Sequence, residues 1–131
     1  MVARMFKEDL NKAMGGIQFG LGAEGGAEYM HKVFFSMLNR DTFNMSMISI
    51  DMANAFQSIG RQVILESCAK RMPRMLPWIA GLLTEATSLM AIGSTGEIIT
   101  WLQTCGVRQG CGLGSALFCL GLAEYADELS A

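Results

Sequence analysis

Residues 48–56, with the sequence Ile-Ser-Ile-Asp-Met-Ala-Asn-Ala-Phe, carry the strongest indication of fold in this chain. The apolar run from Met45 to Ile50 predicts a strand that is covered on both faces, and Asp51 follows it directly. A carboxylate at the end of a strand, beside a sheet edge, is a natural ligand for a hard divalent cation such as magnesium. The residues alone leave a second interpretation open, in which Asp51 caps a turn.

The chain on either side of this segment is predicted to form helices and a short strand pair. The spacing of apolar residues predicts helices over residues 1–14, 27–38, 58–72 and 76–86, and a final helix after the loop 106–114. Ser58 is expected to cap the third helix, and Pro73 to stop it. Residues 88–92 and 98–104 are predicted to pair around the turn Gly93-Ser94-Thr95-Gly96. This order predicts an α+β fold with helices packed on a small, mainly antiparallel sheet.

Composition limits the classes of protein that the chain can represent. Its 131 residues are about the length of one domain, and no linker divides them. Apolar residues make up 51% and charged residues 17%, which argues against intrinsic disorder. Proteins that hold nucleic acid usually carry a basic face, so the net charge of −2 predicts little nucleic-acid binding by this chain alone. The densest basic cluster is expected to be a solvated helix face: Arg61, Lys70, Arg71 and Arg74.

Cysteine spacing and hydropathy bear on the compartment. The four cysteines form no CxxC pair and the only histidine is His31, which favours ordinary reduced, partly buried thiols over a zinc site. The longest stretch without a charged residue, 109–123, is too short to span a bilayer. The first residues lack the apolar run of a signal peptide. An intracellular protein without a membrane partner is therefore expected.

A glycine-rich segment offers a different interpretation. Residues 20–25, Gly-Leu-Gly-Ala-Glu-Gly, match the GxGxxG pattern of dinucleotide-binding domains, and a helix is expected to follow. The pattern requires a buried strand leading into its first glycine. Only Ile17-Gln18-Phe19 precede it, behind Gly15-Gly16, so a dinucleotide-binding domain is a minor alternative. The second glycine-rich loop, 110–114, lacks the lysine of a phosphate-binding loop.

Three segments together resemble the reverse-transcriptase family. Residues 50–56, IDMANAF, are similar to its motif A, and residues 106–122, GVRQGCGLGSALFCLGL, to its motif B. Residues 18–22, QFGLG, resemble the Gln-Phe-Gly segment that precedes motif A. The segments occur in the family's order, and their character is closest to non-LTR retrotransposon polymerases. The resemblance implies a partial fingers–palm of a right-hand polymerase, with residues 1–131 as a single domain truncated at both ends.

The resemblance also implies roles for particular residues. Asp51 would be one of the two palm aspartates that hold magnesium, assisted by the backbone carbonyl of Met52. Phe56 would be the steric gate that excludes a 2′-hydroxyl, and Gln109 and Gly110 would line the incoming nucleotide and the template base. The reaction would be attack of a DNA primer 3′-oxygen on the nucleotide α-phosphate, directed by an RNA template, in the nucleus or cytoplasm.

Several departures from the family pattern predict that the chain alone is inactive. The Tyr-x-Asp-Asp motif that carries the second metal-binding aspartate is expected beyond motif B, and the sequence ends at Ala131 without it. The similar residues 125–128, Tyr-Ala-Asp-Glu, are expected on a helix surface. In motif B, Gly112 replaces the usual proline, and Arg108 and Cys111 are unusual. Weak magnesium binding is expected from Asp51 alone. The alternative is a non-catalytic α+β interaction module or a decayed relic.

Overall fold

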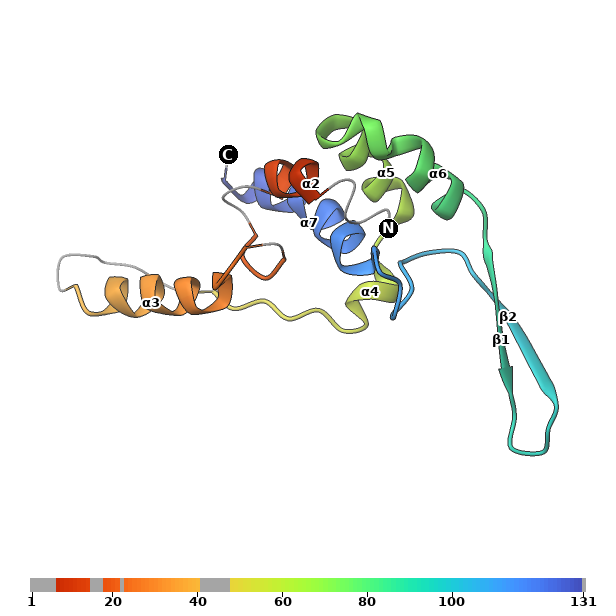
Figure 1. Ribbon diagram of the computed structural model, residues 1–131. Helices are drawn as coiled ribbons and strands as arrows, with labels where there is room; N and C mark the ends of the chain where they lie inside the picture. The colour runs from red at the N-terminus through yellow and green to blue at the C-terminus, as the bar shows by residue number, and fades with distance from the viewer. Residues whose placement is uncertain (1–6, 15–17, 22, 41–47, 131) are drawn as a thin grey trace. The chain divides into compact units, whose positions relative to one another are not determined.

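The computed structural model describes residues 7–14, 18–21, 23–40 and 48–130 (Figure 1). The chain divides into two compact units, Met1–Ala53 and Asn54–Ala131. The described residues form six α-helices and a two-stranded antiparallel sheet, so the predicted α+β class is confirmed. None of the described helices is long and apolar enough to cross a membrane.

The first unit contains two described helices, α2 (Lys7–Met14) and α3 (Gly26–Leu38). Leu10 and Met14, which are four residues apart on one face of α2, are buried. The ring of Phe19 stacks on that of Tyr29 near the start of α3, with centroids 5.5 Å apart. Both helices lie within the ranges predicted from apolar spacing, apart from the first residue of α3.

The strand predicted over Met45–Ile50 is not found in its described part. Ile48, Ser49 and Ile50 are exposed and belong to no strand, while Met45 to Met47 lie outside the described residues. A strand is stable only beside a hydrogen-bonded partner, and the only strands in the described ranges pair with each other. The expectation that Asp51 closes a covered strand is therefore wrong for Ile48 to Ile50.

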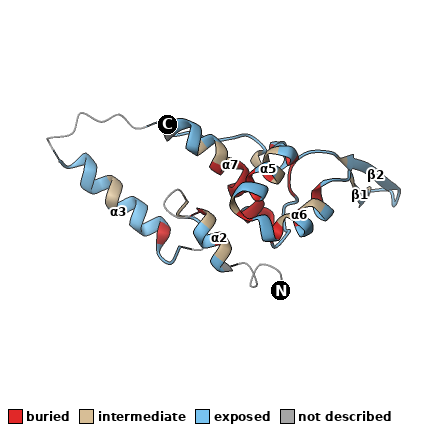
Figure 2. Cartoon of the chain, turned by 90° about the horizontal axis from the view of Figure 1, so that it is seen from above, coloured by how far each residue is buried: buried red, intermediate tan, exposed pale blue. Residues whose placement is uncertain are grey.

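The second unit is built around α5 (Arg61–Arg71), which packs against α6 (Leu76–Leu83) and α7 (Gly114–Ser130). A short helix α4 (Ala55–Ser58) precedes α5, and the 3-10 turn η1 (Pro73–Met75) separates α5 from α6. Figure 2 shows the buried residues concentrated on these helices, and the most deeply buried side chains are Ile64, Ser67, Cys68, Met75, Ile79 and Leu120. The four cysteines are free thiols, two buried and two exposed, as expected.

The boundaries of these helices differ from the predictions at two places. Ser58 ends α4 instead of capping α5, whose N-cap position is occupied by Gly60 without a side-chain hydrogen bond. The helix predicted to reach residue 86 ends at Leu83. The predicted stop before Pro73 is confirmed, because α5 ends at Arg71 and the proline occupies the first position of η1.

Strands β1 (Thr87–Ile92) and β2 (Ile98–Gln103) form the predicted hairpin. Its turn is closed by two backbone hydrogen bonds, from the Gly93 N–H to the Glu97 carbonyl at 2.8 Å and from the Gly96 N–H to the Gly93 carbonyl at 3.0 Å. The hairpin extends away from the helices of its own unit (Figure 1). The expected packing of helices on this sheet is therefore not seen among the helices of the second unit, and most of its large apolar side chains are exposed.

Candidate functional site: the junction of motifs A and B

The loop that opens the segment resembling motif B is hydrogen-bonded to α4, the short helix at the end of the segment resembling motif A. The Val107 N–H donates to the carbonyl of Phe56 at 2.6 Å, and the Gly106 N–H donates to the carbonyl of Ile59 at 2.8 Å. The Cys105 Sγ donates to the carbonyl of Gln57 at 3.2 Å. A helix as short as α4 leaves its last carbonyls without intrahelical partners, and the loop supplies the donors that they lack. The two segments are thus held together within one compact unit.

Gly106 is required at this junction for two reasons. Its φ of 72° lies in the left-handed region, which side chains disfavour. A Cβ at this position would also collide with the backbone of Gln57. The close approach of the loop to α4 therefore depends on the missing side chain.

Phe56 lies at the same junction, partly buried. Its ring stacks on that of Phe118 in α7, with centroids 4.9 Å apart and an interplanar angle of 16°. Gly114, the first residue of α7, lies beside the edge of the Phe56 ring. The residue predicted as a steric gate therefore packs against α7, which begins within the segment that resembles motif B.

Arg61 also contacts the residues of this junction, and this role was not predicted from the sequence. It is buried, and its Nε donates to the carbonyl of Gly106 at 3.1 Å. Its Nη1 donates to the carbonyls of Glu85 at 2.7 Å and of Leu83 at 3.4 Å. The expectation of a solvated face is wrong for this residue. One signal was present, since the helix macrodipole disfavours a cation at the first residue of a helix unless other groups stabilise it.

Gln109 and Gly110 lie in an exposed turn of the same loop. The Cys111 N–H donates to the Arg108 carbonyl at 3.3 Å across this turn, and Gly110 has a φ of 82°. Both predicted nucleotide-binding residues are exposed on the loop that Arg61 and α4 hold in place. The turn is thus accessible to a ligand from solvent.

Asp51 and Met52 belong to the first unit, and both are exposed. Gln109 belongs to the second unit, so the implied roles of Asp51 and Gln109 in one polymerase site stay predictions. Within the described ranges no group of three His, Cys, Asp or Glu residues is arranged to hold a metal ion. A magnesium pair needs several carboxylate or phosphate oxygens, so the described residues do not by themselves fit one.

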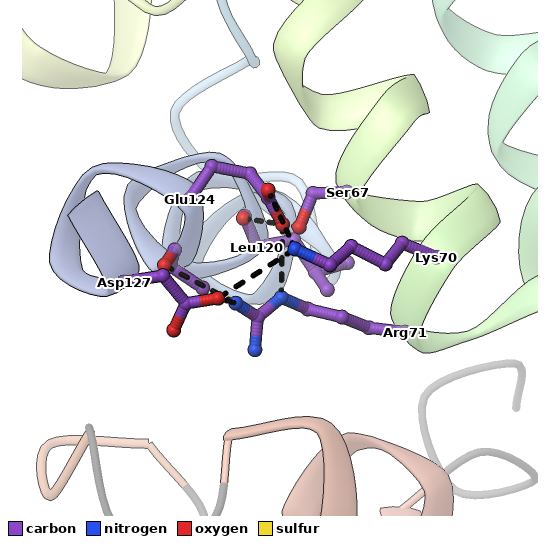
Figure 3. A network of polar contacts seen from close by, with 7 residues as sticks. Ser67, Lys70, Arg71, Leu120, Glu124 and Asp127 are labelled. Carbon is purple, nitrogen blue, oxygen red and sulfur yellow. Dashed lines mark hydrogen bonds and ion pairs between the residues drawn. The ribbon is translucent and has the colours of Figure 1, made fainter. Parts of the chain in front are cut away.

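The residues Tyr125 to Glu128, which imitate a catalytic motif, lie on α7 as expected. Figure 3 shows that Asp127 forms an ion pair with Arg71 of α5, and Glu124 contacts both Arg71 and Lys70. Partial desolvation acts against the ionised form of Glu124, but the hydrogen bonds from Arg71 and Lys70 outweigh it and hold the pKa of Glu124 below its ordinary value. The ion pairs of Glu124 and Asp127 therefore stabilise the packing of α7 against α5.

The buried polar contacts beside these ion pairs fix the same interface. The Ser67 Oγ donates to the carbonyl of Leu120 at 2.6 Å (Figure 3). Arg71 Nη2 donates to the carbonyl of Ala123 at 3.2 Å. Burial raises the pKa of the neighbouring Cys68 thiol, which keeps it protonated near neutral pH. The interface between α5 and α7 thus has a structural role that positions Phe118 against Phe56.

The GxGxxG segment lacks the local structure of a dinucleotide site in its described part. Gln18 and Phe19 lie in bends or irregular structure, not in a strand, and Ile17 and Gly22 are outside the described residues. The Gln18 Oε1 instead accepts a hydrogen bond from the Leu21 N–H at 2.8 Å, which closes a local turn. The dinucleotide interpretation therefore has no support from these residues.

Comparison with known proteins gives one informative relationship. The chain is similar to a retrotransposable-element protein. It is 30% identical over 122 residues to the "Retrotransposable element SLACS 132 kDa protein" of Trypanosoma brucei gambiense, in a match that covers 92% of this chain and 10% of that protein. The chain thus spans about a tenth of the length of the curated relative that it matches. No family model and no solved structure match the chain.

Proposed function

We propose that this chain is the motif A–motif B part of a retroelement reverse transcriptase, which adds deoxynucleotides to a DNA primer on an RNA template. The observation that carries the proposal is the docking of residues 105–107 on α4, which holds the motif B loop against the end of motif A. These contacts join two of the segments that carry the family resemblance, which supports the proposal. The similarity to a retrotransposable-element protein supports the same origin.

In this proposal Phe56 is the steric gate that contacts the sugar of the incoming nucleotide. Stacking on Phe118 limits the rotation of its ring, and a gate discriminates best when its surface is fixed. Gln109 and Gly110 line the nucleotide from the exposed turn next to α4. The start of their loop is held at Gly106, because the Gly106 N–H donates to the Ile59 carbonyl and the Gly106 carbonyl accepts a hydrogen bond from Arg61 Nε.

Asp51 and the Met52 carbonyl are proposed as magnesium ligands of the complete polymerase. Asp51 precedes α4 by a few residues and is exposed, so it is free to take part in a larger set of ligands. The described part of the chain brings no such set to it. We therefore infer that the metal site, and with it the binding of template and primer, depends on further carboxylates and basic residues.

The test places residues 1–131 in the corresponding segment of an active non-LTR reverse transcriptase. We expect primer extension by this chimera, and Asp51→Asn should lower it by on the order of several powers of ten, because a metal-binding charge is lost. Glu128→Gln, which changes an exposed carboxylate near the end of α7, should leave the rate unchanged. Phe56→Val should increase incorporation of ribonucleotides. An active chimera that is indifferent to both Asp51→Asn and Phe56→Val would refute the proposal.

A further inference from the structure

The β1–β2 hairpin exposes apolar side chains on both of its faces. Neither strand contains a charged residue. Trp101 is 48% exposed and Leu102 is 66% exposed, although both are large apolar residues. The other exposed large side chains of the hairpin are Met90, Ile92, Ile98 and Ile99. A surface of this kind, without charges or prolines that block association, is typical of an interaction site.

The charges around the hairpin favour a protein partner over nucleic acid. Residues 75–107 contain no lysine or arginine, and their only charged residues are Glu85 and Glu97. A surface that binds nucleic acid needs cations to neutralise the phosphates. The partner that binds the exposed surface of the hairpin is therefore expected to be an uncharged polypeptide segment.

The backbone of β2 has hydrogen-bonding groups that point away from β1. Along an antiparallel ladder, residue pairs that are hydrogen-bonded to each other alternate with pairs that are not. Gly93 and Glu97 are a hydrogen-bonded pair, because the Gly93 N–H donates to the Glu97 carbonyl. Counting along the register from this pair, Ile98, Thr100 and Leu102 direct their N–H and C=O groups outward. These groups have no hydrogen-bond partner within the part of the chain that the structure describes. The outer edge of β2 is therefore open to another strand.

We propose that this edge pairs with β2 of a second copy of the chain, in an antiparallel arrangement centred on Thr100. In this register Thr100 lies opposite Thr100 of the second copy, and Ile98 lies opposite Leu102. Each of these pairs exchanges both of its N–H···O bonds. On the other face of the sheet Ile99 lies opposite Trp101, an aromatic and β-branched pair of the kind that stabilises sheets. The order Ile-Ile-Thr-Trp-Leu makes the strand complementary to itself, as a two-fold interface requires.

The edge of β1 is a poorer candidate for the same pairing. Its outward-facing residues are Ser88, Met90 and Ile92, so an arrangement centred on Met90 places Ser88 opposite Ile92. On the other face of the sheet, Leu89 of one copy would then lie opposite the small Ala91 of the second copy, and this pair buries little apolar surface. Pairing through β2 is favoured because every non-central pair joins two large apolar side chains.

The size of the β2 surface predicts a reversible dimer of modest affinity. The exposed parts of Ile98, Ile99, Trp101 and Leu102 are on the order of 400 Å² per chain, about half of the ~800 Å² that each partner buries in a standard interface. Association is therefore expected in the micromolar range. The arrangement joins the two copies by a four-stranded sheet, β1-β2-β2-β1.

Sedimentation velocity of the full chain over the micromolar concentration range tests this proposal. We expect the mass to rise with concentration from 14.2 kDa towards twice that value. Thr100→Pro removes an outward N–H from each copy and leaves the hairpin's own bonds in place, so it should weaken dimerisation by about tenfold or more. Ser88→Pro is the matched control, because it removes an outward N–H from the β1 edge and should leave the dimer unchanged.

A second pair of variants keeps the test independent of proline. Trp101→Lys should abolish dimerisation, whereas Trp78→Lys, at an exposed tryptophan of α6, should not. Circular dichroism establishes that each variant remains folded. A wild-type chain that stays monomeric over the whole range overturns the proposal. Equal loss of association in Thr100→Pro and Ser88→Pro, or in the two tryptophan variants, overturns it as well.

Discussion

The ring of Phe56 stacks on the ring of Phe118, with centroids 4.9 Å apart and planes inclined by 16°. Phe56 lies in α4 and Phe118 in the first turns of α7, so the contact joins the segment that resembles motif A to the segment that resembles motif B. An aromatic pair of this kind contributes about 0.5–1.5 kcal/mol beyond the burial of its area. The orientation of Phe56 therefore depends on a residue nearly half the chain away in sequence.

Truncation of Phe118 should measurably destabilise the second unit. Phe118→Ala removes the stacking partner and leaves a cavity, and we expect a loss of roughly 2–4 kcal/mol in the free energy of unfolding. Phe118→Leu keeps most of the apolar volume and should cost about 1–2 kcal/mol. Urea unfolding followed by circular dichroism measures both changes. A negligible loss for leucine would show that the ring stack contributes nothing beyond apolar volume.

Gly106 and Gly110 provide a matched test of the motif B loop. Both have positive φ, but a Cβ at Gly106 would meet the backbone of Gln57, while one at Gly110 would meet open space. Gly110→Ala should cost about 1 kcal/mol, from backbone strain alone. Gly106→Ala should cost clearly more, roughly 3 kcal/mol, because the loop must leave α4. Thermal unfolding compares the two variants, and a similar loss in both would contradict the close approach at Gly106.

Arg61 should be necessary for an ordered junction. Arg61→Met leaves the carbonyls of Leu83, Glu85 and Gly106 without their charged donor, and each unsatisfied buried carbonyl costs about 1–3 kcal/mol. We expect a loss of roughly 2–4 kcal/mol and faster hydrogen exchange at the Gly106 and Val107 amides. Arg108→Met is the control, because this arginine is exposed on the same loop. Unchanged amide exchange in Arg61→Met would show that α4 alone holds the loop.

The ion pairs between α5 and α7 predict a specific dependence of stability on pH. The folded-state pKa of Glu124 lies below its ordinary value of 4.5, so its contribution is fully present above that value and is lost as pH falls through the folded pKa. Glu124→Gln should therefore lower stability at pH 7 by about 1 kcal/mol or less, since the pairs are partly exposed. The difference from wild type should shrink as the pH falls below 4.5 and through the lowered folded-state pKa, and it should also shrink in high salt. Glu128→Gln, at an exposed position, should show no such difference, and a pH-independent deficit in Glu124→Gln would contradict the assignment.

The 131-residue chain should not extend a primer even when template, deoxynucleotides and magnesium are supplied. Two-metal catalysis needs several carboxylates around the metal pair, and within the described ranges no three His, Cys, Asp or Glu side chains are grouped to hold a metal ion. The net charge of −2 also gives the chain little affinity for template and primer. A gel assay of primer extension makes the measurement. Extension by this chain that Asp51→Asn abolishes would show that Asp51 already lies in a complete metal site.

The sequence alone determined those parts of the fold that depend on neighbouring residues. The hairpin was predictable because β-branched and apolar residues flank a glycine turn, and α3 and α5 because their apolar residues recur at helical spacing. The resemblance to motifs A and B could be found in the sequence because the residue patterns that carry it are themselves local. The strand expected over Met45–Ile50 failed in its described part because an apolar run predicts a strand only if a partner strand lies beside it.

Only the tertiary structure revealed how the candidate site is held together. No local pattern indicates that Arg61 is buried under the motif B loop, that Phe118 supports Phe56, or that Asp127 pairs with Arg71. Each of these contacts joins residues from distant segments and depends on the packing of α5, α6 and α7. Local propensity acts over a few neighbouring residues. Desolvation and close packing act on whichever residues the fold brings together, so contacts that depend on them are decided only when the chain is folded.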